Sequence, residues 1–392
     1  MIIIVNRAAC GIRNILQAIV LDKQNNTLCG EIIAWYANTM KNREVPCMSY
    51  KVYEGNPAYP YHIRDVHISD PFIYADPVTK KYYTYVQFID RKRFPEIEVT
   101  EPCFFVLESE DLINWSKPEI CFRKGDFWAD LDYWAPEMHL WKGKYYLISS
   151  FRAKGTYRRC QCLVGDSPKG PFKPIRQEPV TPEGWQALDG TLYVDRKGKP
   201  WMVFCHEWLQ VNDGQICAVP LSDDLGSAIG DPVILFRASD GPWTSKKLEV
   251  GVGGGWVTDG PFLYRLKSGK LIMLWSSFAE TGGYTTGFAV SASGDILGPW
   301  IQQDRVLYAM DGAHSMLFHT FNGQLMMSLH CPNNHPEKRI LLFEMEETKD
   351  GIHIINEVTG NWYNKIGGIA KLYKYKDPCV ETPCFSNSPI AD

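Results

Sequence analysis

Five stretches of the chain share one order of polar and hydrophobic positions. Each has a polar residue, a short apolar run, a turn containing Gly or Lys, and a second run rich in aromatic residues. They read DPFIYADPVTKKYYTYV from Asp70, APEMHLWKGKYYLISSF from Ala135, DGTLYVDRKGKPWMVFCHEW from Asp189, DGPFLYRLKSGKLIMLWSSF from Asp259 and HSMLFHTFNGQLMMSLHCP from His314. Short apolar runs on both sides of a turn predict β-hairpins.

The repeat predicts an all-β fold, and its spacing favours a five-bladed β-propeller. The hairpins begin roughly 55 to 70 residues apart, which is the length of a four-stranded sheet with its loops. A β-sandwich would not explain why a polar residue recurs at the start of the hairpins. In a propeller the first strand of each blade lines the central axis, so we expect these residues to face one shared cavity.

The N-terminal part of the chain does not follow this pattern. Residues 1–47 are expected to be an N-terminal extension, and residues 48–392 are expected to form the propeller. Within the latter, residues 49–60 are expected to supply a strand that closes the ring against the last blade. The first segment is interrupted by Arg7 and Arg13 and does not resemble a signal peptide, which favours a cytoplasmic location.

Composition narrows the class of ligand. The formal net charge of -4 gives no basic surface for nucleic acid or for membrane, so a small neutral or polar ligand is expected. The chain has 13 Trp, 20 Tyr and 18 Phe, and aromatic rings both fill sheet cores and stack on sugar rings. Its 12 Cys form no Cys-x-x-Cys pair, which predicts buried free thiols in a reducing compartment.

Alignment of the hairpins on the aromatic residue that ends the first strand places five ionisable side chains at equivalent or adjacent positions. They are Asp70, Glu137, Asp189, Asp259 and His314. Converging carboxylates repel one another and lose hydration, so such a ring indicates function. The alternative is that each Asp only begins a strand by bonding nearby backbone amides. Carboxylates in different environments suit glycoside hydrolysis, in which one protonates the leaving oxygen and another activates water.

The five stretches together resemble one enzyme family. HISDPFIYAD, YWAPEMHLWKGKYYL, LDGTLYVDRKGKPWMVF, VTDGPFLYRLKSGKL and GAHSMLFHTFNGQL, within about residues 60–335, are similar to glycoside hydrolase family 43. The resemblance implies a five-bladed propeller that inverts the anomeric configuration, as in arabinofuranosidases, β-xylosidases, arabinanases and some galactanases. It implies that Asp70 is the base and that Asp189 orients a Glu acid and raises its pKa. It also implies that His314 lies on the axis, where a hydrated calcium or sodium ion is bound in many members.

This sequence differs from the family pattern at the position of the general acid. The stretch VTDGP has Asp259 where many members have Glu, so two carboxyls compete for the role. Glu207 ends the second strand of the third hairpin, and an antiparallel hairpin returns that end to the place where Asp189 begins. We expect Glu207 to be the acid and Asp259 to bind a sugar hydroxyl or to share the proton relay.

Further residues near the hairpin ends are expected to bind substrate: Glu137, Trp134, His206, Trp208 and His314. No cofactor is required by this chemistry. The sequence therefore predicts an inverting glycoside hydrolase that uses Asp70, Asp189 and Glu207 to release terminal arabinofuranose or xylose from plant-derived oligosaccharides. Two alternatives stay open, namely a galactose-specific enzyme of the same family and a propeller that binds sugar without turnover.

Overall fold

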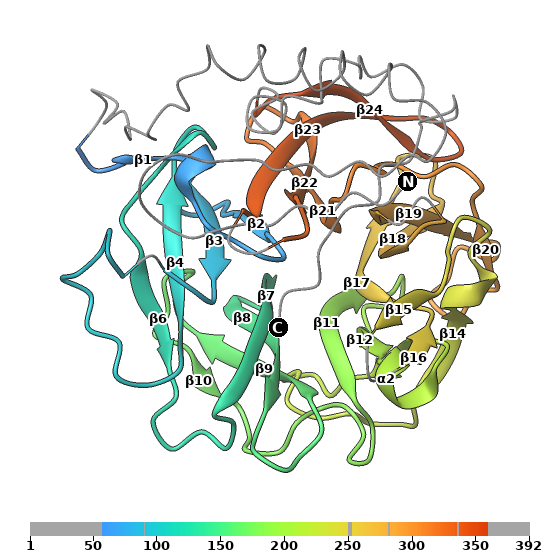
Figure 1. Ribbon diagram of the computed structural model, residues 1–392, viewed down its shortest axis with the longest axis horizontal. Coiled ribbons are helices and arrows are strands. Elements are labelled where there is room, and N and C mark those ends of the chain that lie inside the picture. Colours follow the sequence, from blue (N-terminus) through green and yellow to red (C-terminus); the bar gives the residue numbers. More distant parts are fainter. Residues whose placement is uncertain (1–56, 90, 250–252, 281–282, 335–336, 360–392) are drawn as a thin grey trace, which may run out of the picture. The chain divides into compact units, whose positions relative to one another are not determined.

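The computed structural model describes residues 57–359, apart from residues 90, 250–252, 281–282 and 335–336. Regular structure in this part is almost entirely β, and five sheets are arranged as the blades of a propeller (Figure 1). The predicted fold class is confirmed. The expected extension of residues 1–47 and its boundary lie outside the described residues. Among the helices that the structure describes, none has the length and apolar character needed to cross a membrane.

Blade 1 carries a short extra pair of strands. Its own strands are β2 (Ile73–Ala75), β3 (Tyr82–Val86), β4 (Cys103–Ser109) and β6 (Glu119–Arg123). The extra pair consists of β1 (Tyr61–His62) and β5 (Asn114–Trp115), and β5 joins the sheet beside β4. The 3₁₀ helix η1 (Ile63–Asp65) follows β1 and leads the chain towards β2.

Each of the other four blades is an antiparallel sheet of four strands in sequence order. Blade 2 has β7 (Leu131–Trp141), β8 (Lys144–Arg152), β9 (Arg159–Gly165) and β10 (Lys173–Pro174). Blade 3 has β11 (Ala187–Val194), β12 (Pro200–His206), β13 (Gln215–Pro220) and β14 (Val233–Arg237). Blade 4 has β17 (Asp259–Arg265), β18 (Leu271–Phe278), β19 (Tyr284–Ser291) and β20 (Trp300–Gln302). Blade 5 has β21 (Ala313–His319), β22 (Leu325–Cys331), β23 (Arg339–Glu347) and β24 (Ile352–Glu357).

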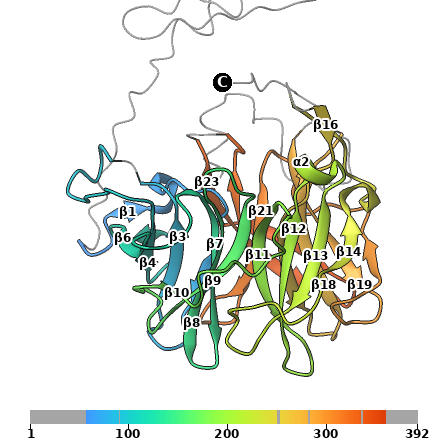
Figure 2. The ribbon, with the colours of Figure 1, turned by 90° about the horizontal axis from the view of Figure 1, so that it is seen from below.

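The elements outside the blades connect strands of blades 3 and 4. They are α2 (Trp208–Val211), η2 (Ala238–Asp240), and the paired strands β15 (Lys247–Glu249) and β16 (Gly253–Gly255). In Figure 1 the first strands β2, β7, β11, β17 and β21 lie nearest the centre of the ring, and β10, β14, β20 and β24 lie at its edge. Figure 2 shows α2 and β16 together at one end of the strands. The five predicted hairpins are therefore the inner halves of the five blades.

The ring closes between blade 5 and the segment that precedes β2. His67 forms an antiparallel bridge with Arg339 of β23, and Nε of Arg339 donates to the carbonyl of Arg64 at 2.9 Å. Residues 57–60, the described part of the segment 49–60 expected to close the ring, contain a turn and no strand, and the rest of that segment lies outside the described residues. Among the described residues the N–H of Ile68 also donates to the carbonyl of Lys338 at this junction.

Each inner hairpin begins with the same irregularity. In blades 3 to 5 the pairing between the first and second strands skips two residues, as in a β-bulge, and in blade 2 it does so twice, at residues 132–133 and again at residues 135–136, of which the second skip is the equivalent one. The first skipped residue has a left-handed backbone, with φ of +46° at Ala135, +55° at Asp189, +51° at Gly260 and +56° at His314. Asp70, just before β2, has the same backbone with φ of +54°. These five residues are the structurally equivalent positions of the propeller.

This register corrects the sequence alignment at two blades. Ala135, and not Glu137, is the counterpart of Asp70 in blade 2. In blade 4 the counterpart is Gly260, and Asp259 is its neighbour. The alignment failed in blade 2 because β7 is long, so the aromatic Trp141 lies two residues beyond the equivalent position.

The bulge removes a backbone N–H from the ladder, and a side chain of the preceding blade accepts its hydrogen bond. The donor and acceptor residues are Asp70 with Nδ1 of His330 (3.1 Å), Asp189 with Oγ of Ser150 (2.9 Å), and His314 with Oγ of Ser276 (2.8 Å). The N–H of Gly260 donates instead to Oδ2 of Asp189 at 3.0 Å. An unpaired buried N–H is costly, so these four bonds fix the backbone at Asp70, Asp189, Gly260 and His314 against the neighbouring blade.

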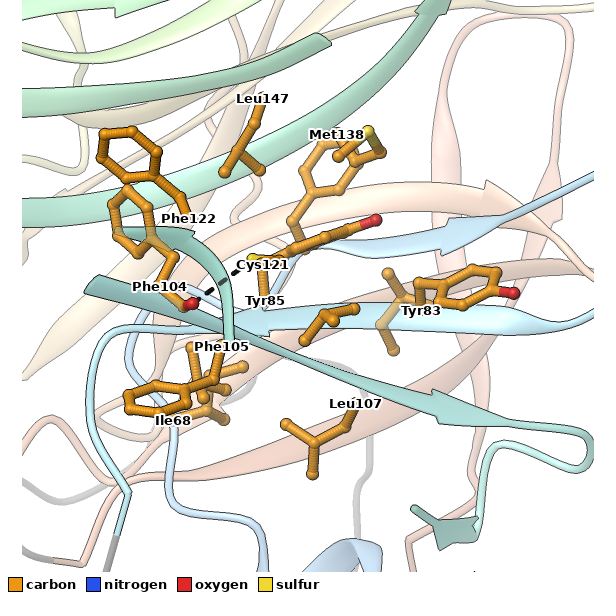
Figure 3. Close-up of a cluster of buried hydrophobic side chains, with 14 of the residues drawn as sticks. Ile68, Tyr83, Tyr85, Phe104, Phe105, Leu107, Cys121, Phe122, Met138 and Leu147 are labelled. Atoms are coloured by element: carbon orange, nitrogen blue, oxygen red, sulfur yellow. Dashed lines mark hydrogen bonds between the residues drawn. The ribbon is translucent and has the colours of Figure 1, made fainter. Parts of the chain in front are cut away.

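The aromatic content is used largely for the core between blades. Figure 3 shows Phe104 of β4 and Phe122 of β6 gathered with Leu147 of β8 and Met138 of β7 in one buried cluster. The predicted buried thiols are confirmed for the cysteines of the described part, which are all buried and unpaired. They are Cys103, Cys121, Cys160, Cys162, Cys205, Cys217 and Cys331.

Candidate active site

Three of the five equivalent positions come together around one imidazole. Nδ1 of His314 lies 3.2 Å from Oδ1 of Asp70 and 3.7 Å from Oδ2 of Asp189. All three residues have the bulge backbone, which turns their side chains towards the same point. His314 and Asp189 are buried, whereas the side chain of Asp70 keeps 19% of its exposure. The structure therefore brings Asp70 and Asp189 together and leaves Asp70 within reach of water.

His314 carries a positive charge between the two carboxylates. Burial alone would lower the pKa of its imidazole, but Asp70 and Asp189 outweigh burial and raise this pKa to about 10. Burial would raise the pKa of Asp70, but the charge of His314 and the hydrogen bond from His314 lower it well below its ordinary value. Asp70 is consequently ionised at neutral pH and can accept a proton.

His330 is neutral, whereas His314 is positively charged. Nδ1 of His330 accepts the N–H of Asp70, and its Nε2 lies 3.2 Å from Oδ1 of Asn333. An imidazole that accepts at Nδ1 carries its proton at Nε2 and is neutral. Burial is the main reason why the pKa of His330 is lowered to about 4. His330 therefore holds the backbone of Asp70 without adding a second cation.

Asp189 is held from blade 4 by Gly260. A Cβ atom at Gly260 would lie 2.8 Å from Cγ of His314, and the backbone there is left-handed, so glycine allows the imidazole to pack this closely. Burial raises the pKa of Asp189 to about 8; the charge of His314 opposes this rise, and the charges of Asp259 and Asp70 reinforce it. Asp189 thus differs sharply in proton affinity from Asp70, although both contact the same imidazole.

Asp259 lies beside this cluster at the first residue of β17. Its Oδ2 accepts a hydrogen bond of 2.5 Å from the hydroxyl of Tyr284. Burial raises the pKa of Asp259, whereas the bond from Tyr284 and the charge of His314 lower it. The ring of Tyr284 also packs against His330, with ring centroids 5.9 Å apart. Tyr284 therefore connects Asp259 to the side chain that holds Asp70.

Glu207 lies at the end of the β11–β12 hairpin where Asp189 begins. Ala187 pairs with His206, and the N–H of Glu207 donates to the carbonyl of Gln186 at 2.8 Å, so the pairing extends to Glu207. Glu207 is also the N-cap residue of α2 and is 7% exposed. The hairpin therefore places both carboxyls at one end of blade 3.

Arg158 connects Glu207 to the edge of blade 2. Its Nη1 donates to Oε2 of Glu207 at 2.8 Å and its Nη2 to Oδ2 of Asp132 at 3.0 Å. The guanidinium lies over the ring of Trp134, 3.7 Å from the ring centroid. Burial raises the pKa of Glu207, Arg158 opposes the rise and the charge of Asp259 adds to it. A buried carboxyl with a raised pKa can hold a proton near neutral pH.

Two expected substrate-binding residues of blade 3 are instead engaged within the fold. The ring of His206 stacks on Trp185, with centroids 4.1 Å apart and an interplanar angle of 10°. Its Nδ1 and Nε2 lie 3.1 Å and 2.8 Å from the side-chain oxygens of Gln215 and Gln210. Trp208 is buried against the backbone of β16. Both side chains are buried, and the substrate-binding role expected for each stays a prediction.

Glu137 is also buried, whereas Trp134 is partly exposed, and the binding role expected for each stays a prediction. Glu137 is 4% exposed, lies two residues beyond the bulge of blade 2, and has its Oε2 3.2 Å from Nε2 of His139. The negative charge of Glu137 helps to raise the pKa of His314, so Glu137 influences the charge of this imidazole. Trp134 is 37% exposed, and the guanidinium of Arg158 covers one face of its ring.

The expected calcium or sodium ion near His314 stays a prediction. Nδ1 of His314 is engaged by the carboxyls of Asp70 and Asp189. Within residues 57–359, with the gaps stated above, no group of three or more His, Cys, Asp or Glu side chains is arranged to hold a metal ion. We therefore derive no step of the chemistry through a metal.

Sequence reasoning missed four residues that shape this site, namely His330, Arg158, Asp132 and Tyr284. His330 had a usable signal, because it is a polar residue inside the apolar strand MMSLHC of the last hairpin. Arg158 precedes the apolar strand of β9 and looks like an ordinary exposed residue in the sequence. Asp132 and Tyr284 belong to no repeated pattern, so only the structure brings them to the carboxyls.

Comparisons with known proteins agree on one family. The model of Glycosyl hydrolases family 43 matches residues 63–353. A solved endo-arabinase from Bacteroides thetaiotaomicron has a TM-score of 0.69 and 42% identity, covering 75% of this chain and 99% of that one.

Two curated relatives match over shorter stretches. The Xylosidase/arabinosidase 43A of Humicola insolens is 35% identical over 81 residues, 21% of this chain and 24% of the relative. An extracellular exo-α-(1→5)-L-arabinofuranosidase of Cellvibrio japonicus is 24% identical over 52% of this chain and 62% of the relative. The chain therefore spans about a quarter and about three fifths of these relatives. Because the family model runs from η1 into β24 and so covers all five blades, the chain belongs to glycosyl hydrolases family 43.

Proposed function

We propose that this protein is an inverting glycoside hydrolase that releases terminal pentose, arabinofuranose or xylose, from plant-derived oligosaccharides. The observation that carries the proposal is the contrast among neighbouring carboxyls. The pKa of Asp70 is lowered, whereas those of Asp189, Asp259 and Glu207 are raised. Inverting hydrolysis needs one ionised carboxylate and one protonated carboxyl on opposite sides of the scissile bond.

In the proposed reaction Asp70 accepts a proton from the attacking water, which its partial exposure admits. The water oxygen bonds to the anomeric carbon on the face opposite the leaving group, and the bond from that carbon to the glycosidic oxygen breaks. Glu207 gives its proton to that oxygen. Burial and the nearby carboxyl of Asp259 help to keep Glu207 protonated, and Asp189 takes the modulating role from the same end of blade 3. A separation of about 6.5–9.5 Å between the base and acid carboxyls would leave room for the water.

The relatives support arabinofuranose as the first sugar to test. Arabinose appears in the names of both curated relatives and of the solved endo-arabinase. The 42% identity to that endo-arabinase, across 99% of its chain, favours a second candidate function, which is cleavage within an arabinan chain. The two candidates share the chemistry and differ in whether the sugar chain continues on both sides of the scissile bond.

The proposed activity is tested with 4-nitrophenyl arabinofuranoside, xyloside and galactoside and with linear arabino-oligosaccharides. We expect hydrolysis of the arabinofuranoside, with kcat reduced about 10²- to 10⁴-fold in Asp70→Asn. Release of single arabinose units would support exo action, and a ladder of shorter oligosaccharides would support endo action. Proton NMR of the first product should show the inverted anomer. Preference for the galactoside would refute the pentose assignment, and calorimetric binding of sugar without turnover would refute catalysis.

The identity of the acid is tested by two isosteric variants, Glu207→Gln and Asp259→Asn. Loss of the acid slows substrates with a poor leaving group far more than 4-nitrophenyl glycosides, because nitrophenolate leaves without protonation. We expect this leaving-group dependence in Glu207→Gln. Full activity of Glu207→Gln on an arabino-oligosaccharide would contradict the assignment and would transfer the role to Asp259.

A further inference from the structure

Glu207, the proposed acid, lies in a closed ring of hydrogen bonds with Gln186 and Gln210. Its N–H donates to the carbonyl of Gln186 at 2.8 Å, and its carbonyl accepts the N–H of Gln210 at 2.9 Å. A side chain closes the ring, because Oε1 of Gln210 accepts the N–H of Gln186 at 2.7 Å. Both backbone groups of Glu207 are therefore fixed by two residues that are also bonded to each other.

The amide of Gln210 makes two further hydrogen bonds, which define its orientation. Its Nε2 donates to the carbonyl of Gly184 at 2.8 Å, and its Oε1 lies 2.8 Å from Nε2 of His206. An amide oxygen can only accept, so Nε2 of His206 carries a proton and donates to it. The side chain of Gln210 thereby joins residues 184–186, the end of β12 and α2.

The residues on either side of Glu207 are held by packing. The ring of His206 stacks on Trp185, which lies between the two residues that bond the amide of Gln210. Trp208 packs so closely on Gly255 of β16 that a Cβ atom there would lie 2.3 Å from Cε3 of the indole ring. The backbone of Glu207 is thus held between two buried rings.

The carboxyl of Glu207 does not cap its own helix. Glu207 is the N-cap residue of α2, but its side chain makes no capping hydrogen bond and binds Arg158 instead. Capping side chains usually stabilise the first turn of a helix, and a helix of four residues is too short to be stable alone. The side chain of Gln210 supplies contacts that hold α2 in place while the carboxyl of Glu207 stays available for chemistry.

We propose that Gln210 is a positioning residue for the general acid, which it holds through the backbone of Glu207 and through His206. The inference rests on the proposed function, since it takes Glu207 as the acid. A general acid must lie within hydrogen-bond reach of the glycosidic oxygen, and a displacement of about 1 Å can cost about 100-fold in rate. Loss of the Gln210 amide therefore weakens protonation of the leaving group and not the binding of sugar.

The test compares Gln210→Met with Gln324→Met as a matched control. Methionine keeps the unbranched side chain of glutamine but lacks the amide. Nε2 of Gln324 also donates to backbone carbonyls, those of Leu325 and Met345. Gln324 lies between β21 and β22, at the end of β21 away from His314. Thermal unfolding of both variants reports whether the fold is retained.

We expect Gln210→Met to lower kcat about 10- to 100-fold on a linear arabino-oligosaccharide, with little change in KM. The loss on 4-nitrophenyl arabinofuranoside should be far smaller, because nitrophenolate leaves without protonation. Gln324→Met should leave the ratio of the two kcat values unchanged. In the Glu207→Gln background, Gln210→Met should have no further effect on that ratio, since Gln210 acts through the acid. An unchanged ratio in Gln210→Met, or a further change of the ratio in the Glu207→Gln background, would overturn the positioning role.

Gln210→Glu is the conservative variant, and it also serves if Gln210→Met does not fold. Its carboxylate still accepts the N–H of Gln186, so the ring around Glu207 stays closed and the bond to Gly184 is lost. We expect a ratio of the two kcat values close to that of the wild type. A shift of this ratio by about tenfold or more would overturn the hydrogen-bonded ring as the cause.

Failure of the proposed function has a separate signature. The wild type would then hydrolyse none of the substrates, or Glu207→Gln would keep full activity on the oligosaccharide. In either case the position of the Glu207 carboxyl is judged by urea unfolding, in double-mutant cycles of Arg158→Met and Glu207→Gln. The coupling between these two side chains should be smaller in the Gln210→Met background than in the Gln324→Met background. Equal coupling in the two backgrounds would overturn positioning by Gln210.

Discussion

Replacement of Arg158 by methionine is the most informative change for the electrostatics of the site. Methionine keeps an unbranched apolar stem but removes the guanidinium that binds Glu207, Asp132 and the ring of Trp134. Asp132 keeps a second cationic partner in Arg152. Glu207 would therefore be the carboxyl left buried without a counter-charge.

The loss of stability in Arg158→Met is limited because Glu207 can bind a proton instead of remaining charged. It can bind a proton, which costs about 1.36 kcal/mol for each pH unit above an ordinary glutamate pKa of about 4.3. The ceiling on its contribution to destabilisation is therefore about 4.4 kcal/mol at pH 7.5 and about 1.6 kcal/mol at pH 5.5. Loss of the cation raises the folded-state pKa of Glu207 further above its unfolded value, so the stability gained by protonation is present at low pH and lost as the pH rises.

Urea unfolding of wild type and Arg158→Met at pH 5.5 and pH 7.5 measures this difference. We expect the variant to be less stable at both values and the deficit to be smaller at pH 5.5 by up to about 2.7 kcal/mol. The control adds Glu207→Gln to both proteins, which should remove the pH dependence because an amide does not titrate. An equal deficit at the two pH values in the Glu207 background would refute the reasoning.

Three further predictions concern the bulge residues. In His314→Gln the carboxyl of Asp70 loses its cation, so its pKa rises and the acid limb of the kcat/KM profile should move to higher pH; an unmoved limb would contradict the pairing. Gly260→Ala should cost at least about 1–2 kcal/mol in thermal unfolding, from the left-handed backbone alone, and should lower kcat because its Cβ would displace His314. Ser276→Ala should cost about 1–3 kcal/mol in urea unfolding, because the buried N–H of His314 loses its acceptor.

The fold could be predicted from the sequence because the five inner hairpins repeat the same local pattern of two apolar runs around a turn. Alternating apolar runs around a turn specify two paired strands without reference to the rest of the molecule. The bulge has no such signal, since two skipped residues change the register without changing the apolar pattern. This is why Glu137 was aligned with Asp70, and why Ala135, an apolar residue, was not recognised as the equivalent position.

The candidate site was predictable only where a residue belongs to the repeat. Asp70, Asp189 and His314 recur at the same place in their hairpins, and the structure brings them into contact. Arg158 and Glu207 belong to different blades, and a contact between blades produces no repeated pattern in the sequence. His206 and Trp208 flank Glu207 in the chain, but side chains on either side of a strand end point in different directions.

The hydrogen bond from the N–H of Asp70 to His330 has a consequence for the order of assembly. Its donor belongs to the first blade and its acceptor to the last, so the loop that presents the proposed base is anchored only once the C-terminal blade has docked. A newly synthesised chain would thus acquire its other carboxyls before its base. Proteolytic removal of β22 should abolish hydrolytic activity while most of the remaining sheets stay folded.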